Sequence, residues 1–348
     1  MGILKTSCAQ IAGISCTFPA QEISTNSVAH RLGISAKRLI AVTGIESRRV
    51  APAGICASDL CHNAAERLLK KLEWPKNSVS ALIFLSQTPD FILPATACLL
   101  QHRLGLSKSC MSFDINMGCS GYIYGLMVAA SLVQCGLDRV MLLVGDTINR
   151  ICSNEDKSVA SLFGDAGSAT AIQKGESNFT FLAETDGSGA EHLIVPAGQS
   201  RQRVTARLCQ RQVDQNGNIR SAQELYMNGA EVFEFANREV PVLFERLQHE
   251  SGYHKDDFDA VVMHQANQFM LDSLGRKLGI SKARTLSSVR MFGNTSCASI
   301  PVTISMCLHN KPQNKTFKIA MLGFGVGWSW AACAADIGAT KILDPEFI

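Results

Sequence analysis

The sequence predicts an α/β fold made of two duplicated halves. Short apolar runs alternate with helix-like stretches of about 10–15 residues along the chain. Three apolar runs recur in the same order in each half, which indicates an internal repeat. The chain has 348 residues, of which 46% are hydrophobic and 18% charged, so it has enough apolar material for the large core that such a fold requires.

The first copy of the repeat contains a candidate nucleophile. Its apolar runs predict strands at 79–85 and 139–145 and an extended segment from Phe113, which meets a Gly-Cys-Ser-Gly turn and a helix expected over 122–134. Glycines beside Cys119 let the backbone approach a substrate closely. The start of the following helix is expected to favour the thiolate of Cys119. We therefore predict that Cys119 is a nucleophile.

The second copy places two polar side chains at corresponding turns. Its apolar runs lie at 258–263, 299–308 and 317–323. The first run leads to His264, and Asn294 precedes the second run. The separation of His264 and Asn294 nearly equals that of Gln87 and Cys119. Turn-forming residues at 173–178 mark the boundary, which gives halves 1–175 and 176–348 whose strand ends are expected to converge on one cleft.

Cys119, His264 and Asn294 together suit thioester chemistry. Each is weak evidence alone, because a cysteine at a helix start can be structural, a histidine after a strand can be a near-core residue, and Gly-Asn is a common turn. Together they supply a nucleophile and two hydrogen-bond donors for one oxygen. The thiolate would carry an acyl group, and backbone amides of Cys119 and of the turn 323–327 would stabilise the tetrahedral oxyanion. His264 and Asn294 would hold the carbonyl oxygen of a malonyl-type thioester.

At the level of motifs, the sequence resembles the β-ketoacyl-acyl carrier protein synthase III family of the thiolase superfamily. The matching motifs cover nearly the whole chain and lie at 43–45, 93–97, 117–121, 163–167, 227–233, 264–267, 293–296 and 323–327. The resemblance implies a five-layered αβαβα fold, a homodimer and a Cys119–His264–Asn294 triad. It also implies that Asn267, Phe324 and Gly325 support the site.

The same resemblance implies an activity and its partners. The expected reaction is decarboxylating condensation of an acyl thioester starter with a malonyl thioester, expected to be malonyl-acyl carrier protein, giving a 3-oxoacyl product. Coenzyme A or phosphopantetheine thioesters would then be substrates, and no resident cofactor is expected. The acyl carrier protein is the expected macromolecular partner.

Further positions are assigned by the resemblance to substrate or carrier contacts. Arg38 stands at one of two positions where housekeeping members hold coenzyme A, the other being Val42, and Arg150 matches an arginine that faces the nucleotide. Leu93 lies at the interface position that often limits the acyl pocket with a bulky Phe, and Phe233 ends a matching motif. The expected substrate-binding residues are therefore Arg38, Arg150, Leu93 and Phe233. Phe269 replaces an arginine implicated in carrier docking, and the basic pair Arg276 and Lys277 is kept on the same helix.

Several other classes are disfavoured. A net charge of +3 gives no reason to expect nucleic acid, and no apolar run reaches the length of a membrane span, so a cytoplasmic protein is expected. The 13 cysteines include no Cys-x-x-Cys pair, and the histidines lack metal-ligand spacing, so neither a disulfide framework nor a metal is predicted. A reversible thiolase is disfavoured because Cys333 is followed by two alanines rather than by a Cys-x-Gly turn.

Some alternatives stay open on the sequence. The acyl group could pass from Cys119 to an alcohol or amine in specialised metabolism, or the chain could be a partner subunit of a condensing complex. The starter group, its carrier and the pathway, fatty-acid initiation or polyketide-type assembly, are not defined. The irregular stretch 196–224 is either a solvated loop or the border of a substrate entrance.

Overall fold

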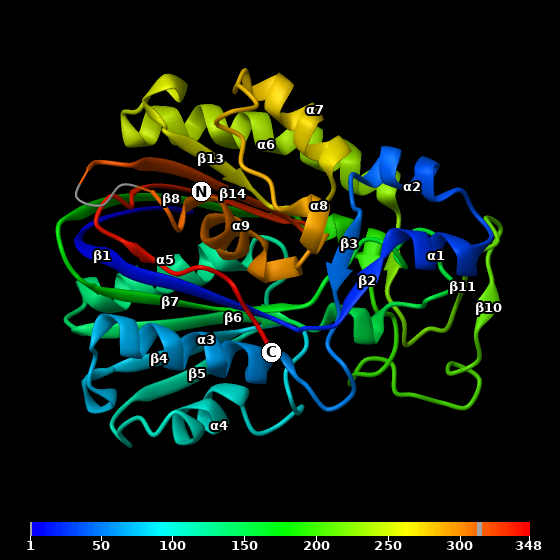
Figure 1. Cartoon of the computed structure of the whole chain (residues 1–348), viewed down its shortest axis with the longest axis horizontal. Coiled ribbons are helices and arrows are strands. Elements are labelled where there is room, and N and C mark those ends of the chain that lie inside the picture. The colour runs from blue at the N-terminus through cyan, green and yellow to red at the C-terminus, as the bar shows by residue number, and fades with distance from the viewer. Residues whose placement is uncertain (1, 312–314) are drawn as a thin grey trace.

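The computed structural model describes residues 2–311 and 315–348 and shows helical and sheet layers in alternation (Figure 1). The strands are β1 Gly2–Phe18, β2 Glu22–Ser24, β3 Ser47–Arg49, β4 Ala81–Leu85, β5 Met111–Ile115, β6 Arg139–Asp146, β7 Ala166–Lys174, β8 Ser177–Thr185, β9 Leu193–Ile194, β10 Gln212–Val213, β11 Ile219–Arg220, β12 Tyr226–Met227, β13 Ala260–Met263, β14 Lys318–Gly325, β15 Ser329–Asp336, β16 Lys341–Ile342 and β17 Glu346–Phe347. The helices are α1 Thr25–Leu32, α2 Ala36–Thr43, α3 Ala57–Leu72, α4 Thr96–Arg103, α5 Gly121–Gln134, α6 Gly229–Ser251, α7 Gln268–Leu278, α8 Val289–Phe292 and α9 Ser299–Leu308.

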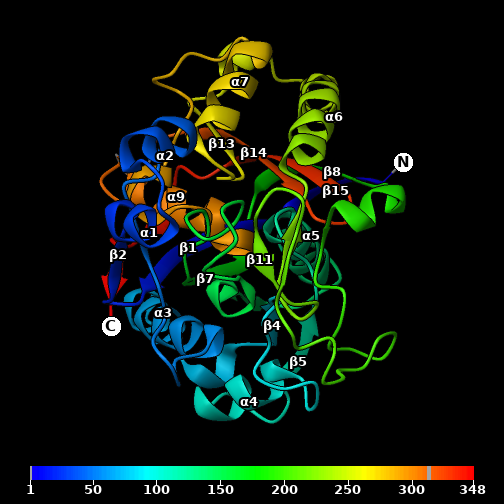
Figure 2. The ribbon, with the colours of Figure 1, turned by 90° about the vertical axis from the view of Figure 1, so that its right-hand side faces the viewer.

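The layers follow the five-layered αβαβα order. Helices α6 and α7 cover the sheet of the second half, α5 and α9 lie in the middle, and α3 and α4 cover the sheet of the first half (Figures 1 and 2). Helix α5 carries apolar residues on all its faces, as a helix between two sheets must. The predicted α/β fold of thiolase type is confirmed.

Strand pairing is the same in the two halves. In the first half, β5, β4 and β6 are parallel neighbours, and β7 runs antiparallel between β6 and β1. In the second half, β13 and β14 are parallel, β15 runs antiparallel between β14 and β8, and a parallel bridge from Val261 to Thr285 extends the edge. Because β1 pairs with β7 in one layer and with β8 in the other, the two sheets form one continuous hydrogen-bonded path in the order β13-β14-β15-β8-β1-β7-β6-β4-β5.

Strand β1 joins the two halves. Its first residues, from Gly2 to Thr6, pair with β8, and its later residues, from Ala9 to Thr17, pair with β7. Residue 175 lies in the turn between β7 and β8. The boundary at 175 thus falls in the turn between two strands that flank β1 in the sheet, and the first residues of β1 contribute to the sheet of the second half.

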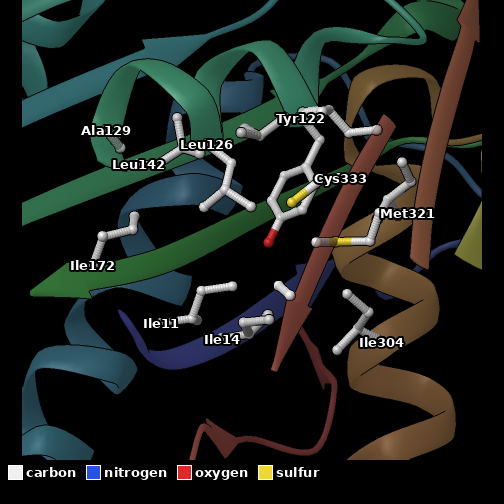
Figure 3. Close-up of a cluster of buried hydrophobic side chains, with 14 of the residues drawn as sticks. Ile11, Ile14, Tyr122, Leu126, Ala129, Leu142, Ile172, Ile304, Met321 and Cys333 are labelled. Atoms are coloured by element: carbon white, nitrogen blue, oxygen red, sulfur yellow. The ribbon is translucent and has the colours of Figure 1, made fainter. Parts of the chain in front are cut away.

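The core fills the space between the two sheets with side chains from both halves. Figure 3 shows part of it, with residues from β1, α5, β6, β7, α9, β14 and β15 around the buried Tyr122. Its labelled members are Ile11, Ile14, Tyr122, Leu126, Ala129, Leu142, Ile172, Ile304, Met321 and Cys333. Cys333 is fully buried there and is a core residue.

The predicted runs all fall on elements of the fold. The runs 79–85 and 258–263 give β4 and β13, which begin two residues later than predicted because short 3-10 turns precede them. The stretch 196–224 contains only the small β10–β11 hairpin and is otherwise irregular. Over 2–311 and 315–348, no helix combines the length and apolar character of a transmembrane segment.

Candidate active site

Cys119 lies in the loop between β5 and α5 and lines two cavities. Only 8% of it is exposed. Its side chain packs directly on β14, where a Cβ added to Gly325 would lie 2.6 Å from both Cβ and Sγ of Cys119. Glycine at 325 therefore allows the nucleophile and the strand to approach each other this closely.

Burial has a larger effect on the pKa of the Cys119 thiol than the start of helix α5. Loss of solvation raises the pKa of the thiol from its ordinary value to about 11, with a further increase from the buried Asp146. Hydrogen bonds from the backbone of Val326 and of Cys119 itself lower the pKa only in part. The expected thiolate is thus not the resting form, and Cys119 is a thiol near neutral pH. The two backbone amides do lie close to the sulfur, as the predicted oxyanion site requires.

His264 directly follows β13 and is held by β14 and α9. Its backbone N–H donates to the carbonyl of Leu322 at 2.7 Å, and its Nδ1 lies 2.8 Å from Oγ of Ser299. The edge of the ring faces Phe324, with centroids 5.7 Å apart at 90°. Burial lowers the pKa of His264 to about 3, so the imidazole is neutral at physiological pH. When the Ser299 hydroxyl donates to Nδ1, the free Nε2 carries a proton that it can donate.

Asn294 is fixed by its own backbone. Its N–H donates to the carbonyl of Leu162 at 2.9 Å, and its carbonyl accepts from Gly164 at 3.0 Å. The side-chain Oδ1 accepts from the N–H of Ser296 at 2.9 Å. Because the oxygen is engaged, the amide group offers its NH₂ as a donor. Gly293 precedes it with φ 62°, and a Cβ there would lie 2.5 Å from the Leu162 carbonyl, so the turn requires glycine.

One small cavity of about 60 Å³ joins these groups. Every residue that the sequence assigned to the triad or to its support lines this cavity, namely Cys119, His264, Asn294, Asn267, Phe324 and Gly325. Asn267 also caps α7, because its Oδ1 accepts from the N–H of Met270 at 2.8 Å. The arrangement places a thiol and two side-chain donors around one space, and the backbone amides of Cys119 and Val326 lie close to the sulfur.

The residues that the sequence assigned to substrate contacts do not line the cavity of the triad. Arg38 is exposed on α2, beside a shallow surface pocket. The Arg150 guanidinium donates to the carbonyls of Ile55 and Pro52, so it braces its own chain. Phe233 on α6 stacks on Phe269, with centroids 5.3 Å apart. None of these residues lines the cavities at Cys119 that the structure shows over 2–311 and 315–348.

The remaining predicted positions lie at the surface. Leu93 is 78% exposed in the loop before α4. Arg276 and Lys277 are exposed near the end of α7, and the Lys277 Nζ donates to the carbonyl of Asn237 at 3.1 Å. Both side chains are accessible to another molecule.

Two supporting groups were not predicted from the sequence. Ser299 orients His264, and the Ser296 amide fixes Asn294. Ser296 acts through its backbone N–H, so its residue type gives no signal in the sequence. The signal for Ser299 would have been its place at the start of α9, just after Asn294.

The fold and these side chains define a condensing enzyme that works through an acyl-cysteine. Residues 113–188 match the family model described as 3-oxoacyl-[acyl-carrier-protein (ACP)] synthase III, and residues 248–337 match the model of its C-terminal part. The chain is 33% identical to the β-ketoacyl-[acyl-carrier-protein] synthase III of Natranaerobius thermophilus, over 84% of this chain and 88% of that protein. The chain belongs to the β-ketoacyl-acyl carrier protein synthase III family.

Solved structures agree with this assignment. The crystal structure of a 3-oxoacyl-(acyl-carrier protein) synthase from Burkholderia xenovorans LB400 is 40% identical and covers 100% of this chain and 99% of its own, with a TM-score of 0.93. The synthase III structure from Thermus thermophilus is 31% identical, covers 93% of this chain and 98% of its own, and has a TM-score of 0.81.

Proposed function

We propose that the protein joins an acyl starter, held as a thioester on Cys119, to a malonyl thioester with loss of carbon dioxide. The observation that carries the proposal is the convergence of Cys119, neutral His264 and Asn294 on one cavity. Nucleophile and enolate-stabilising donors must share one space for this chemistry, because the enolate formed at one carbonyl has to attack the other.

In the first half-reaction, the Cys119 sulfur forms a bond to the carbonyl carbon of the incoming acyl thioester. The carrier sulfur leaves and takes up the proton that Cys119 gives up. The backbone amides of Cys119 and Val326 stabilise the tetrahedral oxyanion between these events. Their fixed positions beside the sulfur mean that they need no reorganisation as charge develops.

In the second half-reaction, the carbon–carboxylate bond of the malonyl thioester breaks and releases carbon dioxide. The electron pair becomes an enolate, whose oxygen accepts from Nε2–H of His264 and the NH₂ of Asn294. The enolate carbon then attacks the acyl carbonyl on Cys119, and the sulfur leaves and takes up a proton from solvent. A neutral His264 suits this step, because an imidazolium would stabilise the carboxylate that has to be lost.

The ionisation of His264 also favours condensation over transfer to an alcohol or amine. Such a transfer needs a general base with a pKa near the working pH. Burial lowers the pKa of His264 to about 3, so it is a poor proton acceptor at neutral pH. It remains a good neutral donor, which is the role that condensation requires.

Two variants test the proposal. Cys119→Ala should show no mass increase with acyl-coenzyme A, whereas replacing the exposed Cys135 by alanine should leave acylation intact. Asn294→Ala should still be acylated but should release labelled carbon dioxide from a malonyl thioester about 10²–10³-fold more slowly. Unchanged acylation of Cys119→Ala, or full carbon dioxide release by Asn294→Ala, contradicts the assignment.

We further infer that malonyl groups arrive on an acyl carrier protein that docks at the end of α7. Helix α7 starts at the cavity, where Asn267 caps it, and its Arg276 and Lys277 are exposed near the other end. Its 11 residues span about 16 Å, so the carrier would dock at the surface while a flexible thioester arm reaches inward. The basic pair suits an acidic carrier surface.

A homodimer is also part of the proposal. Strand β5 is an edge of the sheet, and the nearby segment 91–93 exposes three consecutive apolar side chains, Phe91 at 59%, Ile92 at 82% and Leu93 at 78%. Edge strands and contiguous apolar surface are both suited to pairing with a second copy. Light scattering during gel filtration should give a dimer mass. Ile92→Glu should shift it toward monomer and Val213→Glu, on the exposed β10–β11 hairpin, should not.

A further inference from the structure

A second cavity of about 500 Å³ opens beside Cys119. Apolar side chains from the turn after β6, from β9 and from the segment before β12 line much of it, including Ile148, Leu193 and Leu225. The cavity contains Cys119 but neither His264 nor Asn294, so it offers room for the acyl group and not for the malonyl carbonyl. Its volume lies in the range of pockets that hold drug-sized ligands, far more than the methyl of an acetyl group needs.

The polar side chains that line this cavity, which we call the starter cavity, are four amides and the hydroxyl of Ser296. The amide side chains are those of Gln87, Asn116, Gln199 and Gln223. Among residues 2–311 and 315–348, none of these four side chains makes a hydrogen bond to another group of the chain. No Asp, Glu, Lys or Arg lines the cavity. The lining can therefore donate to and accept from a neutral polar group, but it offers no charge to pair with a carboxylate or an amine.

The amide of Gln87 packs against the turn that carries the nucleophile, and the backbone of Gln87 is tightly held. A Cβ added to Gly118, the residue before Cys119, would lie 2.4 Å from the Gln87 Oε1. The fully buried carboxylate of Asp146 accepts from the backbone N–H of Gln87 at 2.7 Å and from that of Thr88 at 3.2 Å. Its second oxygen lies 3.2 Å from the Cys297 sulfur. The buried Asp146 carboxylate thus holds the backbone of the turn that carries Gln87.

We propose that the starter cavity selects an uncharged acyl chain longer than acetyl that carries a hydrogen-bonding substituent, such as a hydroxyl, close to the thioester. Gln87 is the side chain that recognises this substituent. The inference rests on the proposed function, because the acyl group must first be bound to Cys119. The Gln87 amide is half-buried, and a substituent that pairs with it gains a hydrogen bond that an unsubstituted chain lacks, which gives discrimination beyond size alone.

The test compares coenzyme A thioesters that differ only in the acyl group. The rate of acylation of Cys119 is followed by intact-protein mass spectrometry with acetyl, butyryl, 3-hydroxybutyryl and succinyl groups. We expect 3-hydroxybutyryl to react at least about fivefold faster than butyryl, and succinyl to react slowest because its carboxylate would be buried without a partner. Butyryl or succinyl reacting as fast as 3-hydroxybutyryl overturns the inference. So does acetyl reacting fastest, as it would if a partner copy fills the starter cavity.

A variant separates recognition of the substituent from contact with the carrier arm. Gln87→Met keeps the length of the side chain and the backbone hydrogen bond to Asp146 but removes the amide. It should lose the preference for 3-hydroxybutyryl and react with butyryl at the wild-type rate or faster. An equal loss with every thioester would mean that Gln87 contacts the arm, and would overturn the inference.

Two controls keep the result interpretable. Gln212→Met changes an exposed glutamine outside the starter cavity and should leave the preference unchanged. Gln87→Leu, which also removes the amide, serves as a second variant if Gln87→Met does not fold, and should likewise lose the preference. If no thioester acylates the wild-type protein, the proposed function itself fails. Acylation without the preference overturns only this inference.

Discussion

Replacing Gly325 by alanine should slow acylation of Cys119 by about a hundredfold. The added Cβ would lie 2.6 Å from both Cβ and Sγ of Cys119, whereas ordinary contacts begin at 3.4 Å. Relief of this overlap requires a displacement of about 1 Å, and a misplacement of that size at a reacting atom can reduce a rate by about 10²-fold. The same overpacking should cost ~1–3 kcal/mol of the free energy of unfolding.

The assay measures acylation rate and thermal unfolding on the same samples. Gly187→Ala is a matched control, because a Cβ at Gly187 meets nothing within 4 Å and its backbone is not left-handed. We expect the control to acylate at the wild-type rate and Gly325→Ala to remain folded but slow. A folded Gly325→Ala protein that acylates within about twofold of wild type would refute the argument that β14 sets the position of the sulfur.

Three further predictions concern ionisation, orientation and docking. Because the pKa of Cys119 is raised to about 11, alkylation of this residue by iodoacetamide should rise about tenfold per pH unit from pH 7 to 10, and peptide mapping that shows a plateau near pH 8 would contradict the burial argument. Ser299→Ala removes the partner of Nδ1 of His264, so carbon dioxide release should fall about tenfold while acylation is unchanged, and equal loss of both would indicate general damage instead. Arg276→Glu should raise KM for a malonyl carrier protein severalfold without changing kcat or the KM for malonyl-coenzyme A, and a matched rise for both substrates would argue against carrier docking at α7.

The sequence predicted the fold and the centre of the site because both follow from repeated local patterns. Apolar runs mark buried strands, and the turns after equivalent strands meet at one cleft, so Cys119, His264 and Asn294 could be placed together before their contacts were known. Cys333 could be set aside from the residues that follow it, and it is a core residue.

The sequence could not predict properties that depend on packing in three dimensions. The prediction that Cys119 is a thiolate was wrong. A helix N-terminus stabilises a negative charge by only ~0.3–1 kcal/mol, and the cost of removing the thiolate from water at this buried position is larger. The sequence placed an oxyanion amide in the turn 323–327, but only the packing of Gly325 against Cys119 shows that it is the amide of Val326. The sequence also showed no sign that the Arg150 guanidinium donates to the backbone carbonyls of Pro52 and Ile55, and its role in substrate binding stays a prediction.

Strand β1 has a consequence for how the enzyme assembles during synthesis. The residues of β1 are translated before any of their partners, which arrive with β7 and β8 and finally with β16 and β17, which pair with the same strand. Such distant pairing makes folding slow and leaves the unpaired strand exposed to aggregation until the partners appear. A chaperone that shields β1 would therefore be needed most before β8 is synthesised. Because β16 and β17 pair with β1, the first strand gains its last hydrogen-bonded neighbours only when residues 341–347 have been made.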